Sequence, residues 1–148
     1  MRFYLDTSLV VAALIHEAGT PTASAFLSEQ HNQQLLISSW TCVELASALS
    51  IKHRSQVINA EEQQRGLKRF QTWCGQQLQV TEPNASDYST AHQFCAQPSP
   101  ALRAGDALHL AICQRQRSCL VSFDQELCQA AEHYGVSMRL LRINTSAS

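Results

Sequence analysis

Acidic side chains are the residues in this sequence best suited to chemistry. The 148-residue chain contains only four aspartates, Asp6, Asp87, Asp106 and Asp124. Asp6, Asp106 and Asp124 stand at the predicted ends of strands or starts of helices, and one glutamate, Glu44, stands alone in an apolar stretch. Carboxylate oxygens are the ligands that Mg²⁺ and Mn²⁺ prefer. The set therefore predicts a divalent-metal site if the four side chains converge.

Glu44 is the acid hardest to explain as a structural residue. It is the only charged residue in the segment 42–51, and helical spacing places it on one stripe with Trp40, Ala48 and Ile51. A lone carboxylate among apolar side chains is unfavourable unless it is paired or binds a metal. Its position also fits no helix cap.

The three aspartates have a simpler explanation as helix caps. Asp106 and Asp124 lie at predicted helix starts, where an acid gains roughly 0.3–1 kcal/mol from the helix dipole. Asp6 could equally cap the helix that follows it. Whether the aspartates only cap helices or also form a metal site depends on whether they converge with Glu44. Two carboxylates about 4 Å apart repel by about 4 kcal/mol at an effective dielectric of 20, so a converged quartet needs a cation.

Strands and helices are predicted to alternate along the chain. Apolar runs predict strands at 3–5, 35–37, 78–80, 119–122 and 136–141. Helices are predicted at 8–15, 22–30, 41–53, from Asn59 onward, at 86–96, 104–117 and 124–134. This alternation indicates an α/β fold, a three-layer α/β/α sandwich with a mostly parallel central sheet. Residues 56–77 could be a helical insertion.

In such a sheet, ligands bind beyond the carboxyl ends of the strands. Asp6 directly follows the first predicted strand, and Asp124 comes two residues after the fourth. Asp106 stands in the first turn of a predicted helix. Three acids are therefore expected at one edge of the sheet.

Composition indicates one folded domain over residues 1–142 and a flexible polar tail at 143–148. Hydrophobic residues make up 45% of the chain and charged residues 16%. The formal net charge of −1 excludes a strongly basic nucleic-acid binder, so any contact with nucleic acid must come from local patches. The apolar stretch after Asp6 is too short to span a membrane, and no membrane association is expected.

Six cysteines are present, and no two form a C-x-x-C pair. That spacing excludes a zinc ribbon and a thioredoxin-like motif. Most of the cysteines stand in apolar segments. They are expected to be reduced and buried, as is usual in a cytoplasmic protein.

Four short motifs occur in a characteristic order. They are Tyr-Leu-Asp-Thr-Ser at 4–8, Val-Glu-Leu-Ala at 43–46, Gly-Asp-Ala-Leu-His-Leu-Ala at 105–111 and Ser-Phe-Asp at 122–124. Together they resemble the PIN-domain family, in particular the VapC-like ribonucleases of bacterial toxin–antitoxin pairs. The resemblance covers roughly residues 2–142. Its specificity comes from the order, because each acid must match a different structural element.

The resemblance implies a function for each motif. Asp6, Glu44, Asp106 and Asp124 would bind one or two Mg²⁺ or Mn²⁺ ions, with Ser122 accompanying the last acid. The implied activity is endoribonuclease cleavage of RNA, possible targets being tRNA or rRNA, with a 5′-phosphate and a 3′-hydroxyl as products. The implied partner is a cognate antitoxin protein. Apolar faces of the first helices and of the helix at 41–53 suggest a homodimer.

Further residues are candidates for substrate contact. Arg103, close to the acids, is the preferred phosphate contact, and Ser8 is expected to support Asp6 or touch substrate. His109 lies three residues after Asp106 on the same helical face, and packing is the favoured role for it. Packing is likewise favoured over base stacking for Trp40 and Trp73.

The densest basic region leaves two interpretations open. It comprises Lys52, His53, Arg54, Arg65, Lys68 and Arg69. These side chains could bind the phosphates of an RNA backbone beside the site. Alternatively, Glu61 and Glu62 could form ordinary surface ion pairs with Arg65.

Of two other metal-using α/β families, the first is rejected and the second fits only weakly. A phosphoacceptor receiver needs an aspartate after the third strand, where this chain has Glu82-Pro83. A haloacid-dehalogenase phosphatase needs a second aspartate two residues after Asp6, where Ser8 stands. A non-catalytic module that docks RNA or protein, and a housekeeping RNA-processing nuclease, remain as alternatives to the toxin.

Overall fold

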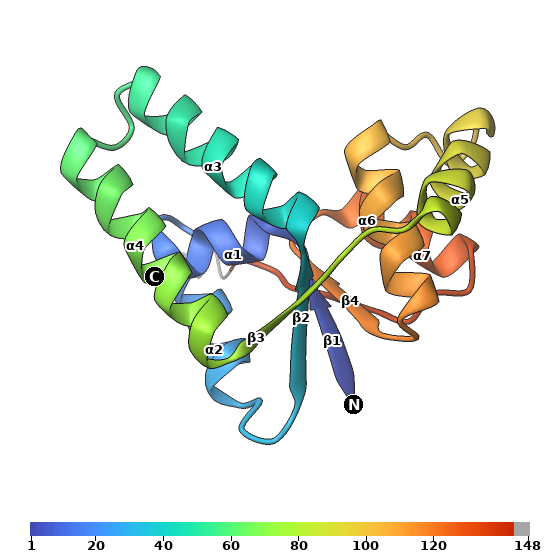
Figure 1. Ribbon diagram of the computed structural model, residues 1–148, viewed down its shortest axis with the longest axis horizontal. Helices are drawn as coiled ribbons and strands as arrows, with labels where there is room; N and C mark the ends of the chain where they lie inside the picture. The colour runs from blue at the N-terminus through green and yellow to red at the C-terminus, as the bar shows by residue number, and fades with distance from the viewer. Residues whose placement is uncertain (144–148) are drawn as a thin grey trace.

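The computed structural model describes residues 1–143 and contains a five-stranded sheet in the spatial order β3-β2-β1-β4-β5 (Figure 1). Every neighbouring pair of strands is parallel. The strands are β1 (Arg2–Leu5), β2 (Gln34–Ser38), β3 (Leu78–Thr81), β4 (Cys119–Ser122) and β5 (Met138–Leu140). The predicted parallel sheet is confirmed. The last strand is shorter than predicted, with only three residues.

The helices form the connections between these strands. They are α1 (Thr7–Leu14), α2 (Thr20–Ser28), α3 (Ser39–Arg54), α4 (Ala60–Gln76), α5 (Ala85–Ala96), α6 (Ala104–Arg115) and α7 (Gln125–His133). Asn59 caps α4 through the predicted capping box, in which its side chain accepts from the backbone N–H of Glu62. Because α4 leads directly into β3, residues 56–77 belong to the crossover between β2 and β3 and are not an insertion.

Alternating side chains of the strands build a core on each face of the sheet. Phe3, Leu5 and Ile37 pack with residues of α1 to α4 in one cluster. Tyr4 and Leu36 pack with residues of α5, α6 and α7 in the other. The pattern follows from the period of two along a strand. It produces the predicted three-layer sandwich, with α3 and α4 and the α5–α7 group on opposite sides in Figure 1.

The strand order reverses direction between β1 and β4. The chain proceeds outward from β1 through β2 to β3, then crosses to β4 on the other side of β1. The backbone N–H of Asp6 continues the β1–β4 ladder by donating to the carbonyl of Val121 at 3.0 Å. Crevices at such switch points are the usual ligand sites of open parallel sheets.

The six cysteines are all free thiols, as predicted. Only Cys113 and Cys128 are buried, so the predicted burial is wrong for the other four, of which Cys95 is exposed. None of the helices within residues 1–143 combines the length and the hydropathy that a membrane-spanning helix needs. The predicted tail lies outside the described residues apart from Ile143.

Candidate active site

A groove of about 550 Å³ opens at the switch point, and all four predicted acids line it. Asp6 follows β1 and Asp124 follows β4, whereas Glu44 comes from α3 and Asp106 from the first turn of α6. Glu44 is brought there because β2 ends at Ser38, which caps α3 at once. Trp40, Ala48 and Ile51, predicted to share a stripe with Glu44, line the same groove.

Asp6 is a buried carboxylate held by three donors. It is 6% exposed. Oδ1 accepts from the backbone N–H of Thr7 at 2.9 Å. Oδ2 accepts from the hydroxyls of Ser8 at 2.9 Å and Ser122 at 2.6 Å. Ser8 thus supports Asp6, as one of its two predicted roles requires.

Ser122 links the two acids that follow β1 and β4. Its fully buried hydroxyl donates to Asp6 and accepts from the backbone N–H of Asp124 at 2.9 Å. One hydroxyl therefore fixes the side chain of the first acid and the backbone of the last. The geometry gives Ser122 a positioning role.

Helix capping accounts for only part of the acid set. Asp6 caps α1, and Asp124 caps α7 by accepting from the backbone N–H of Leu127 at 3.1 Å. The side-chain carboxylate of Asp106 accepts no hydrogen bond from any residue in 1–143. Glu44 lies inside α3, away from either end. Side-chain capping therefore does not account for Asp106 or Glu44.

Burial and the neighbouring acids both act on the pKa of Asp106. Burial, and then the negative charges of Asp6 and Asp124, raise its pKa to about 6. A carboxyl group raised in this way stores unfavourable energy that a cation would relieve. Part of the rise therefore comes from other acids that line the same groove.

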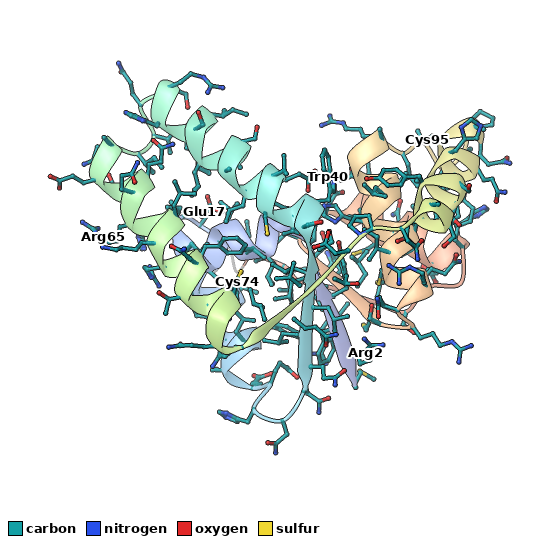
Figure 2. All side chains as sticks on the ribbon, viewed as in Figure 1. Arg2, Glu17, Trp40, Arg65, Cys74 and Cys95 are labelled. Carbon is teal, nitrogen blue, oxygen red and sulfur yellow. The ribbon has the colours of Figure 1, made fainter. Side chains whose placement is uncertain are left out.

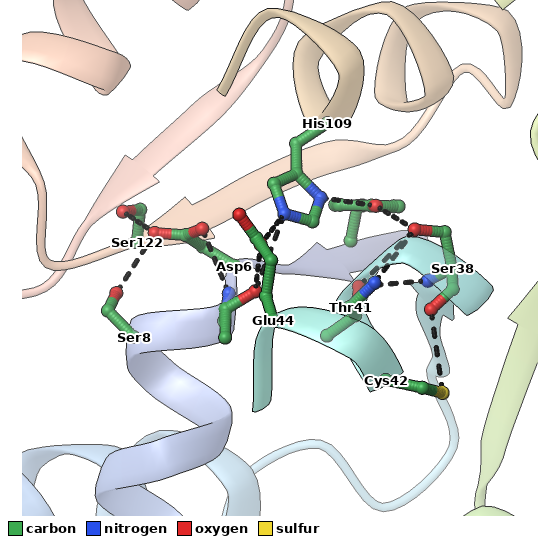
Figure 3. Close-up of polar contacts among 10 residues, drawn as sticks. Asp6, Ser8, Ser38, Thr41, Cys42, Glu44, His109 and Ser122 are labelled. Atoms are coloured by element: carbon green, nitrogen blue, oxygen red, sulfur yellow. Dashed lines mark hydrogen bonds and ion pairs between the residues drawn. The ribbon is translucent and has the colours of Figure 1, made fainter. Parts of the chain in front are cut away.

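Glu44 is stabilised in its ionised form by neighbouring donors. Its Oε1 accepts from the hydroxyl of Thr7 at 2.6 Å and from Nε2 of His109 (Figure 3). Burial alone would raise the pKa of Glu44, but the hydrogen bonds and charge of these neighbours outweigh burial and lower it. The indole N–H of Trp40 contributes from beside Glu44, although it falls short of hydrogen-bond geometry.

His109 is fully buried, in agreement with the packing role favoured for it. It is also bound at both ring nitrogens, to Glu44 through Nε2 and to the hydroxyl of Tyr4 through Nδ1 at 2.7 Å. Sequence reasoning missed Thr7, Tyr4 and this link. Both residues belong to the Tyr-Leu-Asp-Thr-Ser motif at 4–8, but that motif gave no role for either side chain.

The donor set fits a hydrated divalent ion. All four acids offer oxygens, and Asp106 has both of its oxygens free of hydrogen bonds within residues 1–143. In the same residues, no group of three or more His, Cys, Asp or Glu side chains is drawn together closely enough to hold a metal directly. Mg²⁺ usually keeps several waters and uses one or two carboxylates, which suits this looser arrangement.

Basic side chains lie at the groove and farther away. Arg103 is exposed, precedes α6 and lines the groove. Lys52 forms an ion pair with Glu17 at 2.9 Å. Arg65 projects from the outer side of α4 in Figure 2, and no ion pair to Glu61 or Glu62 is found for it in the described part of the chain. The predicted surface pairs are therefore not observed.

The comparisons with known proteins agree with this architecture. A family model described as the PIN domain matches residues 3–133. Ribonuclease VapC35 of Mycobacterium tuberculosis is 31% identical over 134 residues, covering 87% of this chain and 89% of that protein.

Two solved structures share the fold at low sequence identity. VapBC2 from Rickettsia felis, bound to a promoter DNA fragment, gives a TM-score of 0.72 at 14% identity and covers 95% of this chain and 99% of that chain. VapC20 of Mycobacterium tuberculosis, a sarcin-ricin loop cleaving toxin, gives 0.70 at 14% identity, with 86% and 94% covered. With the family model spanning most of the sequence, this chain belongs to the PIN-domain family.

Proposed function

We propose that this chain is a Mg²⁺- or Mn²⁺-dependent endoribonuclease and the toxin of a toxin–antitoxin pair. The observation that carries the proposal is the groove at the β1–β4 switch point, which four acids from four different elements line. The raised pKa of Asp106 supports a site that binds a cation. The similarity to Ribonuclease VapC35 supports RNA as the substrate.

Asp6, Asp106 and Asp124 would hold the ion, with Glu44 as the fourth acid. A bound divalent ion supplies an activated water and neutralises the charge that develops on the phosphate. The protein keeps the acids in place before the substrate arrives. Asp6 is fixed by Ser8 and Ser122, so it loses little freedom when it binds.

Arg103 is proposed to contact the phosphate backbone of the RNA. It is exposed at the rim of the groove, close to the acids. Its cationic fork suits a phosphate. With a formal net charge of −1 for the whole chain, such a local contact must offset the repulsion between RNA and the acidic groove.

The antitoxin and the homodimer are parts of the same proposal. A toxin–antitoxin complex from Klebsiella pneumoniae shares the fold of this chain. Copurification of the tagged chain with the product of the adjacent small gene, followed by mass measurement in solution, would identify both assemblies. A monomer that binds no such product would leave a housekeeping RNA-processing nuclease as the better description.

The decisive experiment is cleavage of a labelled structured RNA pool with Mg²⁺ or Mn²⁺. Wild type is compared with Asp6→Asn, with EDTA, and with Glu132→Gln as a control that removes an exposed acid outside the groove. We expect Asp6→Asn to reduce cleavage at least about 100-fold, EDTA to abolish it, and Glu132→Gln to leave it intact. Wild type that is inert after removal of bound protein would favour the docking module.

A further inference from the structure

We propose that His109 is a positioning residue that fixes one oxygen of Glu44, so that only the other oxygen of this acid is offered to the groove. The contacts carry the inference. Its catalytic consequence rests on the proposed nuclease function, in which Glu44 is one of four metal-binding acids.

The two oxygens of Glu44 have different surroundings. Oε1 accepts from the Thr7 hydroxyl and from Nε2 of His109. Oε2 lies next to Gly105 instead: a Cβ built at that glycine would come within 2.9 Å of it. An ionised carboxylate can only accept, so Nε2 must carry the proton in this contact. Two donors on one oxygen fix the position of that oxygen.

The imidazole ring is itself held in one orientation. Nδ1 is 2.7 Å from the hydroxyl of Tyr4, and the same hydroxyl is 2.9 Å from Oγ of Ser38. Ser38 in turn caps α3 by accepting from the backbone N–H of Thr41. The contacts thus run from the start of α3, through β1 and α6, back to Glu44 on α3, as Figure 3 shows.

Packing alone does not explain an imidazole at this position. His109 is 0% exposed, and all the other buried residues of α6 are apolar. A leucine would fill such a place without the cost of desolvating two ring nitrogens. The hydrogen bonds to Glu44 and Tyr4 offset that cost. What the imidazole adds over leucine is therefore the orientation of Glu44.

Two amide variants separate positioning from packing. His109→Gln places an amide nitrogen near the Nε2 position and can still donate to Glu44. His109→Asn places its amide near Nδ1 and can reach only Tyr4. Mn²⁺ affinity is measured by calorimetry and by the free-Mn²⁺ resonance signal, without RNA. We expect His109→Asn to weaken Mn²⁺ binding by about 10–100-fold and His109→Gln to restore most of it.

Cleavage kinetics give a second readout. For His109→Asn at saturating Mn²⁺ we expect a lower kcat with an unchanged KM for RNA, because His109 does not line the groove. Cooperative unfolding of both variants shows that they fold. His109→Asn that binds Mn²⁺ as tightly as wild type would overturn the proposal.

A measurement on metal-free protein separates this proposal from the nuclease itself. The Nε2 proton of His109 should give an exchange-protected low-field NMR signal in wild type, which Glu44→Ala removes or shifts. If the NMR signal of the Nε2 proton is the same in Glu44→Ala as in wild type, the positioning role of His109 is overturned, irrespective of the cleavage activity. If that signal responds but wild type neither binds Mn²⁺ nor cleaves RNA, the proposed function fails while the positioning of Glu44 stands.

Discussion

The hydroxyl of Ser122 donates to Oδ2 of Asp6 at 2.6 Å across 116 positions of sequence. The contact joins the ends of β1 and β4, the two strands on either side of the switch point. Because the same hydroxyl accepts from the backbone of Asp124, it sets the distance between two acids of the proposed metal site. These two acids are therefore positioned by the ends of two neighbouring strands.

Ser122→Ala should reduce both stability and activity. It removes a fully buried donor to a carboxylate, a hydrogen bond of a kind worth roughly 1.5–3 kcal/mol. We expect the free energy of unfolding in urea to fall by about that amount and RNA cleavage to fall about 10–100-fold. Ser118→Ala is the control, since Ser118 is also buried but bonds to Cys113. Equal activity losses in the two variants would contradict a specific role for Ser122.

Asp106 should make the metal-free protein less stable at neutral pH than at pH 4. Its pKa is about 6 in the folded chain against 3.8 as a model carboxyl group. The folded state therefore binds more protons than the unfolded state between these values, and stability falls as pH rises through them. The penalty is absent below pH 3.8 and complete above pH 6.

Thermal unfolding in EDTA at a series of pH values checks this. Asp106→Asn should flatten the decline between pH 4 and pH 6, and Mg²⁺ should raise the Tm of wild type more at pH 7.5 than at pH 5. The opposing lowered pKa of Glu44 acts in both proteins and cancels in the comparison. An identical pH dependence in Asp106→Asn and wild type would show that Asp106 is not the group responsible.

The sequence predicted the parallel sheet and the gathering of the acids, because both follow from local patterns. Asp6 and Asp124 could be placed from the strands that they follow. The hydrogen-bonded surroundings of Glu44 could not be predicted, because they involve His109 and Tyr4, which lie 105 positions apart in the sequence. Which face of α6 carries the imidazole, and which oxygen of Glu44 it meets, depend on how helices from two crossovers pack. That information exists only in the folded chain.

Gly105→Ala should leave the fold intact and damage the site. An added Cβ would lie 2.9 Å from Oε2 of Glu44 and 3.3 Å from the indole nitrogen of Trp40. Glu44 is held at its other oxygen, so it must tilt or lose a hydrogen bond. Alanine also favours a helix by about 1 kcal/mol over glycine. We expect an unchanged or raised Tm with weaker Mn²⁺ binding and slower cleavage.

Gly75→Ala is the matched control for this substitution. Gly75 also lies within a helix, α4, but an added Cβ there would meet no atom within 4 Å. It should stabilise the protein without changing activity. If Gly105→Ala binds Mn²⁺ and cleaves RNA as well as Gly75→Ala, then Glu44 tolerates displacement, and its observed position is not required for function.

Arg103→Gln should weaken RNA binding through the loss of one phosphate contact. Arg103 is exposed at the rim of the groove. A residue that contacts phosphate contributes to affinity without regard to sequence, and removing it lowers the salt dependence of binding by about one ion. Arg117→Gln is the control, because it removes the same charge from an exposed position outside the groove.

Affinity for an uncleaved RNA is measured in Ca²⁺ at several salt concentrations. We expect a smaller slope of log affinity against log salt for Arg103→Gln and the wild-type slope for Arg117→Gln. Equal slopes in both variants would mean that the RNA approaches the acids along another surface, such as the basic side of α4.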